Sequence, residues 1–147
     1  FPATDALPET NALEKSPIPD GHGQRILYID DEEPLVNLVK RRFELRGYVV
    51  SGFCDPLEAI AAFLAAPERF DVVVTDFNMP TATGLDVARE VLALHPLMPV
   101  ILTSGYLTEE LKTNALRAGI RKLVYKPTSL DKLEEAILES LTRTDSK

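Results

Sequence analysis

Polar side chains that could carry out chemistry stand at the ends of four short apolar runs in the sequence. They are Asp30-Asp31, Asp76, Thr103-Ser104 and Lys126. If each run forms a strand of one parallel sheet, these residues lie at the carboxyl ends of their strands, where ligands bind in such sheets. We therefore expect three carboxylates, a hydroxyl and an amine to converge on one rim, although they are far apart in the sequence.

Carboxylates gathered at one rim repel one another unless a cation neutralises them. Oxygen ligands at a solvent-open rim suit Mg²⁺, which binds carboxylates, waters and phosphate oxygens. A carboxylate beside such an ion is a candidate nucleophile that forms an aspartyl phosphate. The lysine and the hydroxyl would then hydrogen-bond the phosphoryl oxygens and stabilise the charge that develops on them.

Each of these residues also has a plainer explanation when it is taken alone. Asp30-Asp31 could cap the helix that follows them. Lys126 could be a solvated loop lysine, and Ser104 could be a turn residue. Their joint placement at four strand ends favours a common site over these separate explanations.

The elements that must position these residues alternate along the chain. Short apolar runs predict five strands, at residues 26–29, 48–53, 71–75, 98–103 and 122–125. Apolar residues recur at helical spacing after each run, which predicts five helices. One of them is expected over Thr108–Ala118, and the last runs from a cap at Ser129 to Leu141. Because strands and helices alternate, we expect an α/β fold with a doubly wound parallel five-stranded sheet.

The ends of the chain differ from this pattern. Residues 1–24 hold four of the eleven prolines and four acids against one base, without sustained apolar periodicity. Such a segment buries too little surface to offset its ordering entropy, so we expect a Pro-rich linker or N-terminal extension. The alternative is an arm that packs on the domain through its few apolar side chains. Residues 25–141 form the expected domain, and residues 142–147 are expected to be a disordered tail.

Composition excludes several classes of function. The chain has 16 Lys and Arg against 23 Asp and Glu, a net charge of −7, which argues against nucleic acid or an anionic membrane as a partner. Its single cysteine excludes a disulfide framework and a Cys-rich zinc site. No apolar stretch approaches the ~20 residues that span a bilayer, and no signal peptide follows Phe1. These features predict a cytoplasmic domain, cut from a longer protein.

Four motifs, in this order and at these spacings, make the sequence similar to the receiver domains of two-component signalling. They are Tyr28-Ile29-Asp30-Asp31-Glu32, Asp76-Phe77-Asn78-Met79-Pro80 with Gly84-Leu85, Pro99-Val100-Ile101-Leu102-Thr103-Ser104, and Lys126-Pro127. The resemblance covers about residues 25–141. It implies a flavodoxin-like (βα)₅ fold with the strand order 2-1-3-4-5.

The resemblance also implies a role for each residue at the rim. Asp76 is the expected phosphoacceptor, and Lys126 is the expected partner of the phosphoryl group. Asp31, Asp76 and the backbone carbonyl of Asn78 are the expected direct ligands of Mg²⁺. Asp30 is expected to orient the ion through a water molecule.

The hydroxyl that would respond to phosphorylation falls on Ser104, five positions after Pro99 and just before the small residue Gly105. Thr103 is the alternative, because a shift of one residue at a strand end is easily misjudged. Receivers often carry an aromatic residue three positions before the lysine, but here that residue is Leu123, and Tyr125 directly precedes the lysine. We therefore expect a weaker or differently routed response through residues 105–119.

The leading hypothesis is a receiver that takes a phosphoryl group from a phosphohistidine donor, either a histidine kinase or a histidine phosphotransfer (Hpt) domain. Phosphorylation would then alter the face formed by residues 108–118, the fifth strand and the last helix. One rival is a Mg²⁺-dependent phosphohydrolase with an aspartyl nucleophile. Such enzymes usually place an acid two residues after the nucleophile, where this chain has Asn78. The other rival is a degenerate receiver that only binds partners, which the intact set of rim residues disfavours.

The sequence around the domain suggests its context. A proline-rich segment precedes Arg25 and no output domain follows Leu141, an arrangement similar to the last receiver of a hybrid sensor histidine kinase. In that case the donor could belong to the same parent chain, and the parent could be bound to a membrane that this segment does not contact. The alternative is a stand-alone single-domain response regulator. A homodimer is compatible with either context.

Overall fold

The computed structural model describes residues 23–126 and 129–145 of the chain. Strands and helices alternate through these residues, as expected. The elements are β1 (Arg25–Ile29), α2 (Glu33–Leu45), β2 (Val49–Phe53), α3 (Pro56–Ala65), the short 3₁₀ helix η2 (Pro67–Arg69), β3 (Val72–Asp76), α4 (Gly84–Leu94), β4 (Val100–Ser104), α5 (Glu109–Ala118), β5 (Lys122–Tyr125) and α6 (Leu130–Asp145).

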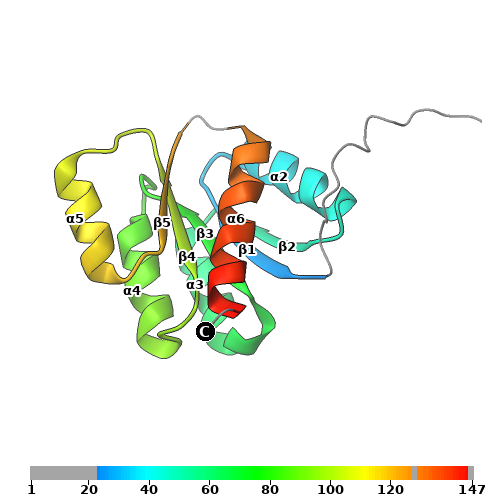
Figure 1. The fold of residues 1–147 in the computed structure, drawn as a ribbon, viewed down its shortest axis with the longest axis horizontal. Coiled ribbons are helices and arrows are strands. Elements are labelled where there is room, and N and C mark those ends of the chain that lie inside the picture. Colours follow the sequence, from blue (N-terminus) through cyan, green and yellow to red (C-terminus); the bar gives the residue numbers. More distant parts are fainter. Residues whose placement is uncertain (1–22, 127–128, 146–147) are drawn as a thin grey trace, which may run out of the picture.

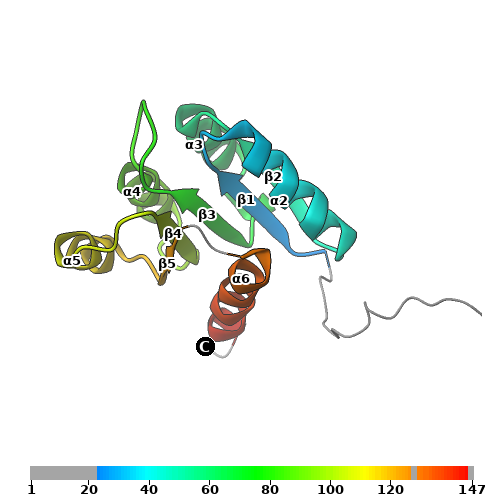
Figure 2. The ribbon, with the colours of Figure 1, turned by 90° about the horizontal axis from the view of Figure 1, so that it is seen from above.

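The five strands form one parallel sheet with the order β2-β1-β3-β4-β5, which confirms the expected topology. Helices cover both faces of this sheet (Figures 1 and 2). Buried residues of α2 and α6 pack on one face, and those of α3, α4 and α5 pack on the other. Among the described residues, no helix is both long and apolar enough to cross a membrane.

The period-two alternation of the central strands divides the core into two halves. Ile26 and Tyr28 of β1 face α2 and α6, while Leu27 and Ile29 face the other three helices. All four side chains are buried. Because side chains of a strand alternate between faces, Asp30 continues the face of Tyr28 beyond the strand end.

Local capping signals begin and end several helices at the expected places. The Asp55 side chain accepts a hydrogen bond from the backbone of Leu57 at 2.9 Å, just before the proline that opens α3. Thr83 caps α4 in a reciprocal capping box with Asp86. Helix α5 ends at Gly119, whose φ of 92° is a left-handed conformation that favours glycine.

The boundaries of the domain differ from the expectation at both ends. Gly23 and Gln24 are hydrogen-bonded to Gly47 and Val49, so these two residues belong to the domain. Helix α6 continues to Asp145 instead of ending at Leu141, and the expectation of a disordered tail from residue 142 is wrong for residues 142–145. Each residue added to an existing helix gains a backbone hydrogen bond without a new nucleation cost. Residues 1–22, 127–128 and 146–147 lie outside the described residues.

Gly84 begins α4 where the helix lies against the end of β3. A Cβ atom at this position would lie 2.5 Å from the backbone oxygen of Asp76 and 2.4 Å from a methyl group of Leu102. The G84A variant is therefore expected to lose about 1–3 kcal/mol of unfolding free energy, measured by urea denaturation. Gly105 is the matched control, since a Cβ there meets nothing closer than 4.0 Å. Equal stability of the G84A and G105A variants would contradict the close approach.

Candidate functional site

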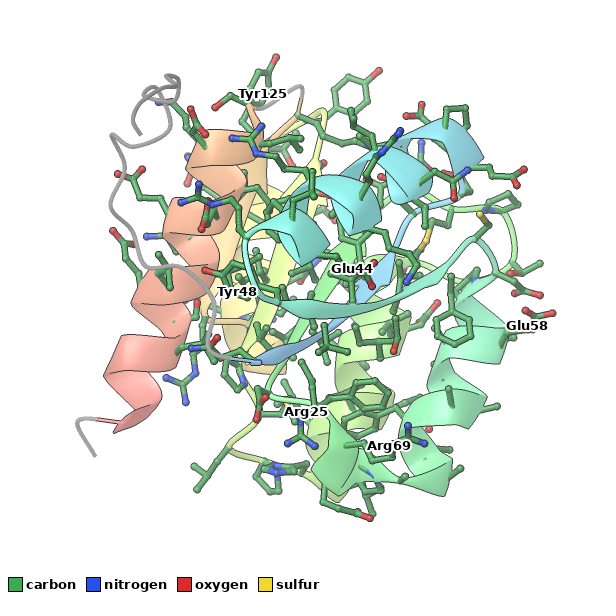
Figure 3. The ribbon with its side chains drawn as sticks, turned by 90° about the vertical axis from the view of Figure 1, so that its right-hand side faces the viewer. Arg25, Glu44, Tyr48, Glu58, Arg69 and Tyr125 are labelled. Carbon is green, nitrogen blue, oxygen red and sulfur yellow. The ribbon has the colours of Figure 1, made fainter. Side chains whose placement is uncertain are left out.

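The polar residues expected at the strand ends lie at one edge of the sheet. Asp30 follows β1, Asp76 and Ser104 are the last residues of β3 and β4, and Lys126 follows β5. In Figure 3 this edge is the one near Tyr125, whereas Arg25 marks the opposite edge, where the strands begin. The parallel topology therefore brings together residues that are distant in the sequence.

Three carboxylates meet at this edge. Ligand oxygens of Asp30, Asp31 and Asp76 all lie within 4.8 Å of one another. Asp30 is fully buried and Asp76 is 5% exposed, whereas Asp31 is open to solvent. Closely spaced carboxylates with one open side fit a hard divalent cation such as Mg²⁺, which binds oxygen ligands and retains several waters.

Lys126 supplies the positive charge between the two buried carboxylates. Its ammonium lies 2.9 Å from Oδ2 of Asp30 and 3.4 Å from Oδ1 of Asp76. The backbone N–H of Lys126 donates to the carbonyl of Ser104 at 2.7 Å, which fixes the lysine at the end of β5. One cation thus faces two buried anions, and the cluster retains excess negative charge.

The electrostatics of the cluster shift the protonation of its members. Burial and the charge of Asp30 raise the pKa of Asp76 to about 6, although the ammonium of Lys126 acts in the opposite direction. Burial alone would lower the pKa of Lys126, but the hydrogen bond and charge of Asp30 and the charge of Asp76 outweigh it and raise that pKa. Asp76 is consequently held ionised at neutral pH at a cost to the fold.

Because a buried, ionised Asp76 destabilises the folded state, we expect the D76N variant to be more stable than the natural chain when no metal is present. The pKa of Asp76 is higher in the folded state than the value of roughly 3.9 in an unfolded chain. The folded chain therefore binds the proton more tightly, and its stability falls as the pH rises from about 4 to about 6. We expect D76N to gain about 1–3 kcal/mol of unfolding free energy at pH 7.5 in a chelator, and little at pH 4.

Thermal or urea unfolding at the two pH values measures this difference. D31N is the matched control, because it removes a carboxylate of the same cluster that is already exposed. If the D76N chain is no more stable than the natural chain at pH 7.5, the ionised Asp76 carboxylate does not lower the free energy of unfolding, and the prediction is wrong.

The two candidate hydroxyls at the end of β4 point to opposite faces. Thr103 pairs with Asp76 in the sheet, and its hydroxyl lies 3.5 Å from Oδ1 of that carboxylate. The Ser104 hydroxyl instead donates to the carbonyl of Tyr106 at 2.7 Å and accepts from the backbone N–H of Tyr106 at 3.0 Å. In this structure the alternative residue, Thr103, is therefore the hydroxyl that contacts Asp76.

Three further residues named from the sequence, Asn78, Leu123 and Tyr125, make no side-chain hydrogen bond to the carboxylates within the part of the chain that the structure describes. Asn78 is exposed in the loop after β3, two residues beyond Asp76. Leu123 packs on the core formed with α3, α4 and α5, whereas Tyr125 at the end of β5 is 55% exposed. The position that often carries an aromatic residue in receivers is thus filled by an aliphatic side chain.

Sequence reasoning missed one side chain at the site. The hydroxyl of Tyr28 lies 3.5 Å from Oδ2 of Asp30, and the ring is buried. Burial and the charges of Asp30 and Asp76 raise the pKa of this tyrosine, so it remains a neutral donor. The signal was available in the period-two spacing of residues 28 and 30, which puts them on one face of β1.

Comparison with known proteins places this geometry in a family context. A model of the response regulator receiver domain matches residues 26–138. The C4-dicarboxylate transport transcriptional regulatory protein DctD of Rhizobium meliloti is 31% identical over 83% of this chain, which spans 25% of that protein. The probable transcriptional regulatory protein TcrX of Mycobacterium tuberculosis is 33% identical over 85% of this chain, which spans 53% of it. The chain thus corresponds to only a part of these relatives.

Solved structures agree with the match. A response regulator receiver domain protein from Clostridium thermocellum has a TM-score of 0.77 and 30% identity, covering 83% of this chain and 97% of that one. A CheY-like receiver domain protein from Methanospirillum hungatei has a TM-score of 0.78 and 27% identity, covering 84% and 98%. Both similarities extend over the described domain.

Proposed function

The chain belongs to the response regulator receiver domain family, and we propose that it accepts a phosphoryl group on Asp76 from a phosphohistidine donor. The observation that carries this proposal is the pairing of one ammonium with two buried carboxylates. The Lys126 ammonium lies 2.9 Å from Asp30 and 3.4 Å from Asp76, at the edge of the sheet where ligands bind.

The transfer is a displacement at phosphorus. A carboxylate oxygen of Asp76 forms a bond to the phosphorus atom while the phosphorus–nitrogen bond of the donor breaks. The electron pair of that bond leaves with the histidine nitrogen, which is protonated by solvent. The Lys126 ammonium neutralises charge on the phosphoryl oxygens, and water later attacks the phosphorus atom to release phosphate and restore the carboxylate.

We assign Asp31, Asp76 and the backbone carbonyl of Asn78 as the residues that would hold Mg²⁺ directly. Asp30 would act on the ion through water, because both of its oxygens already accept hydrogen bonds. When bound, the ion supplies positive charge that screens the carboxylates and the phosphoryl oxygens. The clustered oxygens of Asp30, Asp31 and Asp76 support this assignment.

Ser104 is the proposed switch hydroxyl. It is buried, and it can reach a phosphoryl group on Asp76 only by giving up its two hydrogen bonds to the backbone of Tyr106. Release of Tyr106 would change the loop that leads to the Thr108 cap of α5. This route does not require an aromatic side chain at Leu123.

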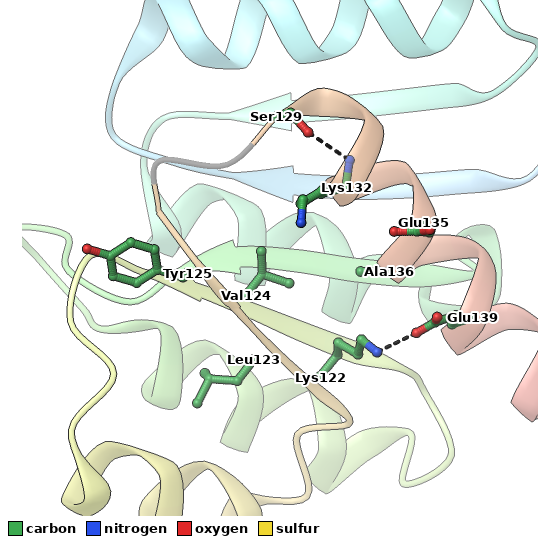
Figure 4. A pocket seen from close by; sticks show the side chains of 9 residues that line it. All are labelled: Lys122, Leu123, Val124, Tyr125, Ser129, Lys132, Glu135, Ala136 and Glu139. Atoms are coloured by element: carbon green, nitrogen blue, oxygen red, sulfur yellow. Dashed lines mark hydrogen bonds and ion pairs between the residues drawn. The ribbon is translucent and has the colours of Figure 1, made fainter.

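The surface proposed to respond consists of α5, β5 and α6. Between β5 and α6 it contains a cavity of about 510 Å³, shown in Figure 4. Lys122 of β5 forms an ion pair with Glu139 of α6, and Leu123 and Tyr125 project from β5. A change at Ser104 reaches this surface directly, because Ser104 pairs with Tyr125 in the sheet.

The kind of protein that contains this receiver domain is also a proposal. The last receiver of a hybrid histidine kinase remains our preferred context, with a kinase or Hpt domain as donor and a cytoplasmic location. The alternative is a stand-alone single-domain response regulator. The relatives DctD and TcrX are transcriptional regulators, and this chain spans 25% and 53% of their length. Homodimerisation is compatible with either context, and binding of partners without phosphorylation is the outcome in which no phosphoryl adduct forms.

Incubation with acetyl phosphate and Mg²⁺ tests the proposal. Intact mass spectrometry should show an acid-stable, base-labile adduct of about 80 Da, the mass of one phosphoryl group. A phosphohydrolase would instead turn over p-nitrophenyl phosphate repeatedly, which we do not expect because Asn78 offers no general acid. The absence of an adduct at millimolar Mg²⁺ would reduce the chain to a binding module.

A further inference from the structure

Each of the two buried carboxylates of the site is contacted by the hydroxyl of a buried side chain. The Tyr28 hydroxyl is 3.5 Å from Oδ2 of Asp30, and the Thr103 hydroxyl is 3.5 Å from Oδ1 of Asp76. We propose that Tyr28 and Thr103 are positioning residues that hold these carboxylates in the orientation required for phosphoryl transfer. The inference rests on the proposed phosphoacceptor role of Asp76.

The register of β1, β3 and β4 places each hydroxyl next to its carboxylate. Tyr28 and Asp30 are two residues apart and share one face of the sheet, with Tyr28 opposite Val74 in the pairing of β1 with β3. Thr103 stands directly opposite Asp76 in the pairing of β3 with β4. A slip of one residue would turn both side chains to the other face, so the register that fixes the core also fixes these contacts.

Asp30 is held on both of its oxygens. Oδ2 accepts from the ammonium of Lys126 at 2.9 Å and from Tyr28, and Oδ1 accepts from the backbone N–H of Glu32 at 3.0 Å. Two donors close in sequence, Tyr28 and Glu32, and one distant donor, Lys126, leave this buried carboxylate little rotational freedom. Tyr28 provides the donor on the interior side, where solvent cannot replace it.

Asp76 is held on one oxygen only. Thr103 and the ammonium of Lys126 both approach Oδ1, at 3.5 and 3.4 Å. Within the described residues, the structure gives Oδ2 of Asp76 no hydrogen bond. The two donors therefore fix the plane of the carboxylate and leave Oδ2 open as the attacking oxygen, which is the orientation that makes transfer efficient.

The surroundings keep the two hydroxyls directed at the carboxylates. Tyr28, Thr103 and Lys126 line a cavity of about 160 Å³, and its other lining residues are Glu32 and the apolar side chains of Leu35, Val39, Leu130 and Leu133. A hydroxyl in apolar surroundings costs free energy unless it donates a hydrogen bond. The carboxylates offer that acceptor.

The test compares the natural chain with T103V, T103S and Y28F, and with T75V as the matched control. Thr75 is a fully buried threonine of β3 whose hydroxyl bonds the backbone carbonyl of Asp76 on the other face. Initial rates of labelling are measured over a range of acetyl phosphate concentrations at saturating Mg²⁺. Mg²⁺ affinity is measured separately, by NMR titration without a phosphoryl donor.

We expect T103V to lower the maximum labelling rate about 3- to 10-fold without changing the donor concentration for half-saturation. T103S, which keeps the hydroxyl, should remain within about twofold of the natural chain, as should T75V. Y28F should weaken Mg²⁺ binding about 3- to 10-fold, since Asp30 loses one of its donors. If T103V fails to fold, T103A takes its place in the comparison with T103S.

Labelling and Mg²⁺ affinity within twofold of the natural chain in both T103V and Y28F would overturn the inference while leaving the phosphoacceptor role intact. An equal loss in T75V would also overturn it, because the effect would then be general destabilisation. A natural chain that is not labelled at all would overturn the proposed function, and this inference with it.

Discussion

Replacement of Asp76 by asparagine is expected to abolish labelling by acetyl phosphate. An amide oxygen carries no charge and is a poor nucleophile, and the neighbouring Asp30 has both oxygens occupied by hydrogen-bond donors. We expect the labelling rate to fall about 100-fold or more, as is typical when a nucleophile is removed. Intact mass spectrometry over time measures the rate directly.

The D31N variant separates loss of the nucleophile from loss of a metal ligand. Asp31 belongs to the carboxylate cluster but is exposed. Its replacement should weaken Mg²⁺ binding and slow labelling at low Mg²⁺, with partial recovery at high Mg²⁺. The D76N chain should not recover at any Mg²⁺ concentration, and recovery there would show that another residue accepts the phosphoryl group.

Replacement of Lys126 by alanine is expected to damage both stability and reactivity. The ammonium is the charge partner of the fully buried Asp30, and removal of one member of a buried pair leaves an uncompensated charge. We expect the unfolding free energy in a chelator to fall by about 3–5 kcal/mol. The labelling rate should fall about 10- to 100-fold, since the phosphoryl oxygens lose a cationic donor.

Urea denaturation and labelling kinetics test the two effects separately. The K126R variant is the control, because it keeps the positive charge while changing the shape of the donor; it should retain most of the stability. The stability effects of K126A and D76N are expected to have opposite signs at pH 7.5. A K126A chain as stable and as reactive as the natural chain would contradict the central role of this ammonium.

The fold could be predicted from the sequence because its signals are local. Short apolar runs such as Val72–Val74 alternate with helices that have clear ends in the sequence. Asp55 caps the start of α3, and Gly119 ends α5. This alternation predicts an α/β fold with a parallel sheet. The gathering of Asp30, Asp76 and Lys126 at one edge then follows from the direction of the strands.

The remaining features depend on contacts that the sequence does not encode locally. Which of Thr103 and Ser104 faces Asp76 depends on the register of β4 against β3, where a shift of one residue exchanges the two faces. The pairing of Ser104 with the backbone of Tyr106 depends on the loop conformation. Helix α6 extends to Asp145, and its sequence contains neither glycine nor proline, the residues that usually mark the end of a helix. The sequence therefore marks no clear position for its end.

The most direct test of the account identifies the residue that carries the phosphoryl group. The chain is labelled with acetyl phosphate and Mg²⁺ and then treated with borohydride, which reduces an aspartyl phosphate to homoserine and leaves free carboxylates unchanged. Peptide mass spectrometry then locates the homoserine. We predict homoserine at position 76 and unchanged aspartate at positions 30 and 31. Homoserine at position 30 or 31, or a borohydride-resistant phosphate on Thr103 or Ser104, would contradict the assignment of Asp76 as the phosphoacceptor.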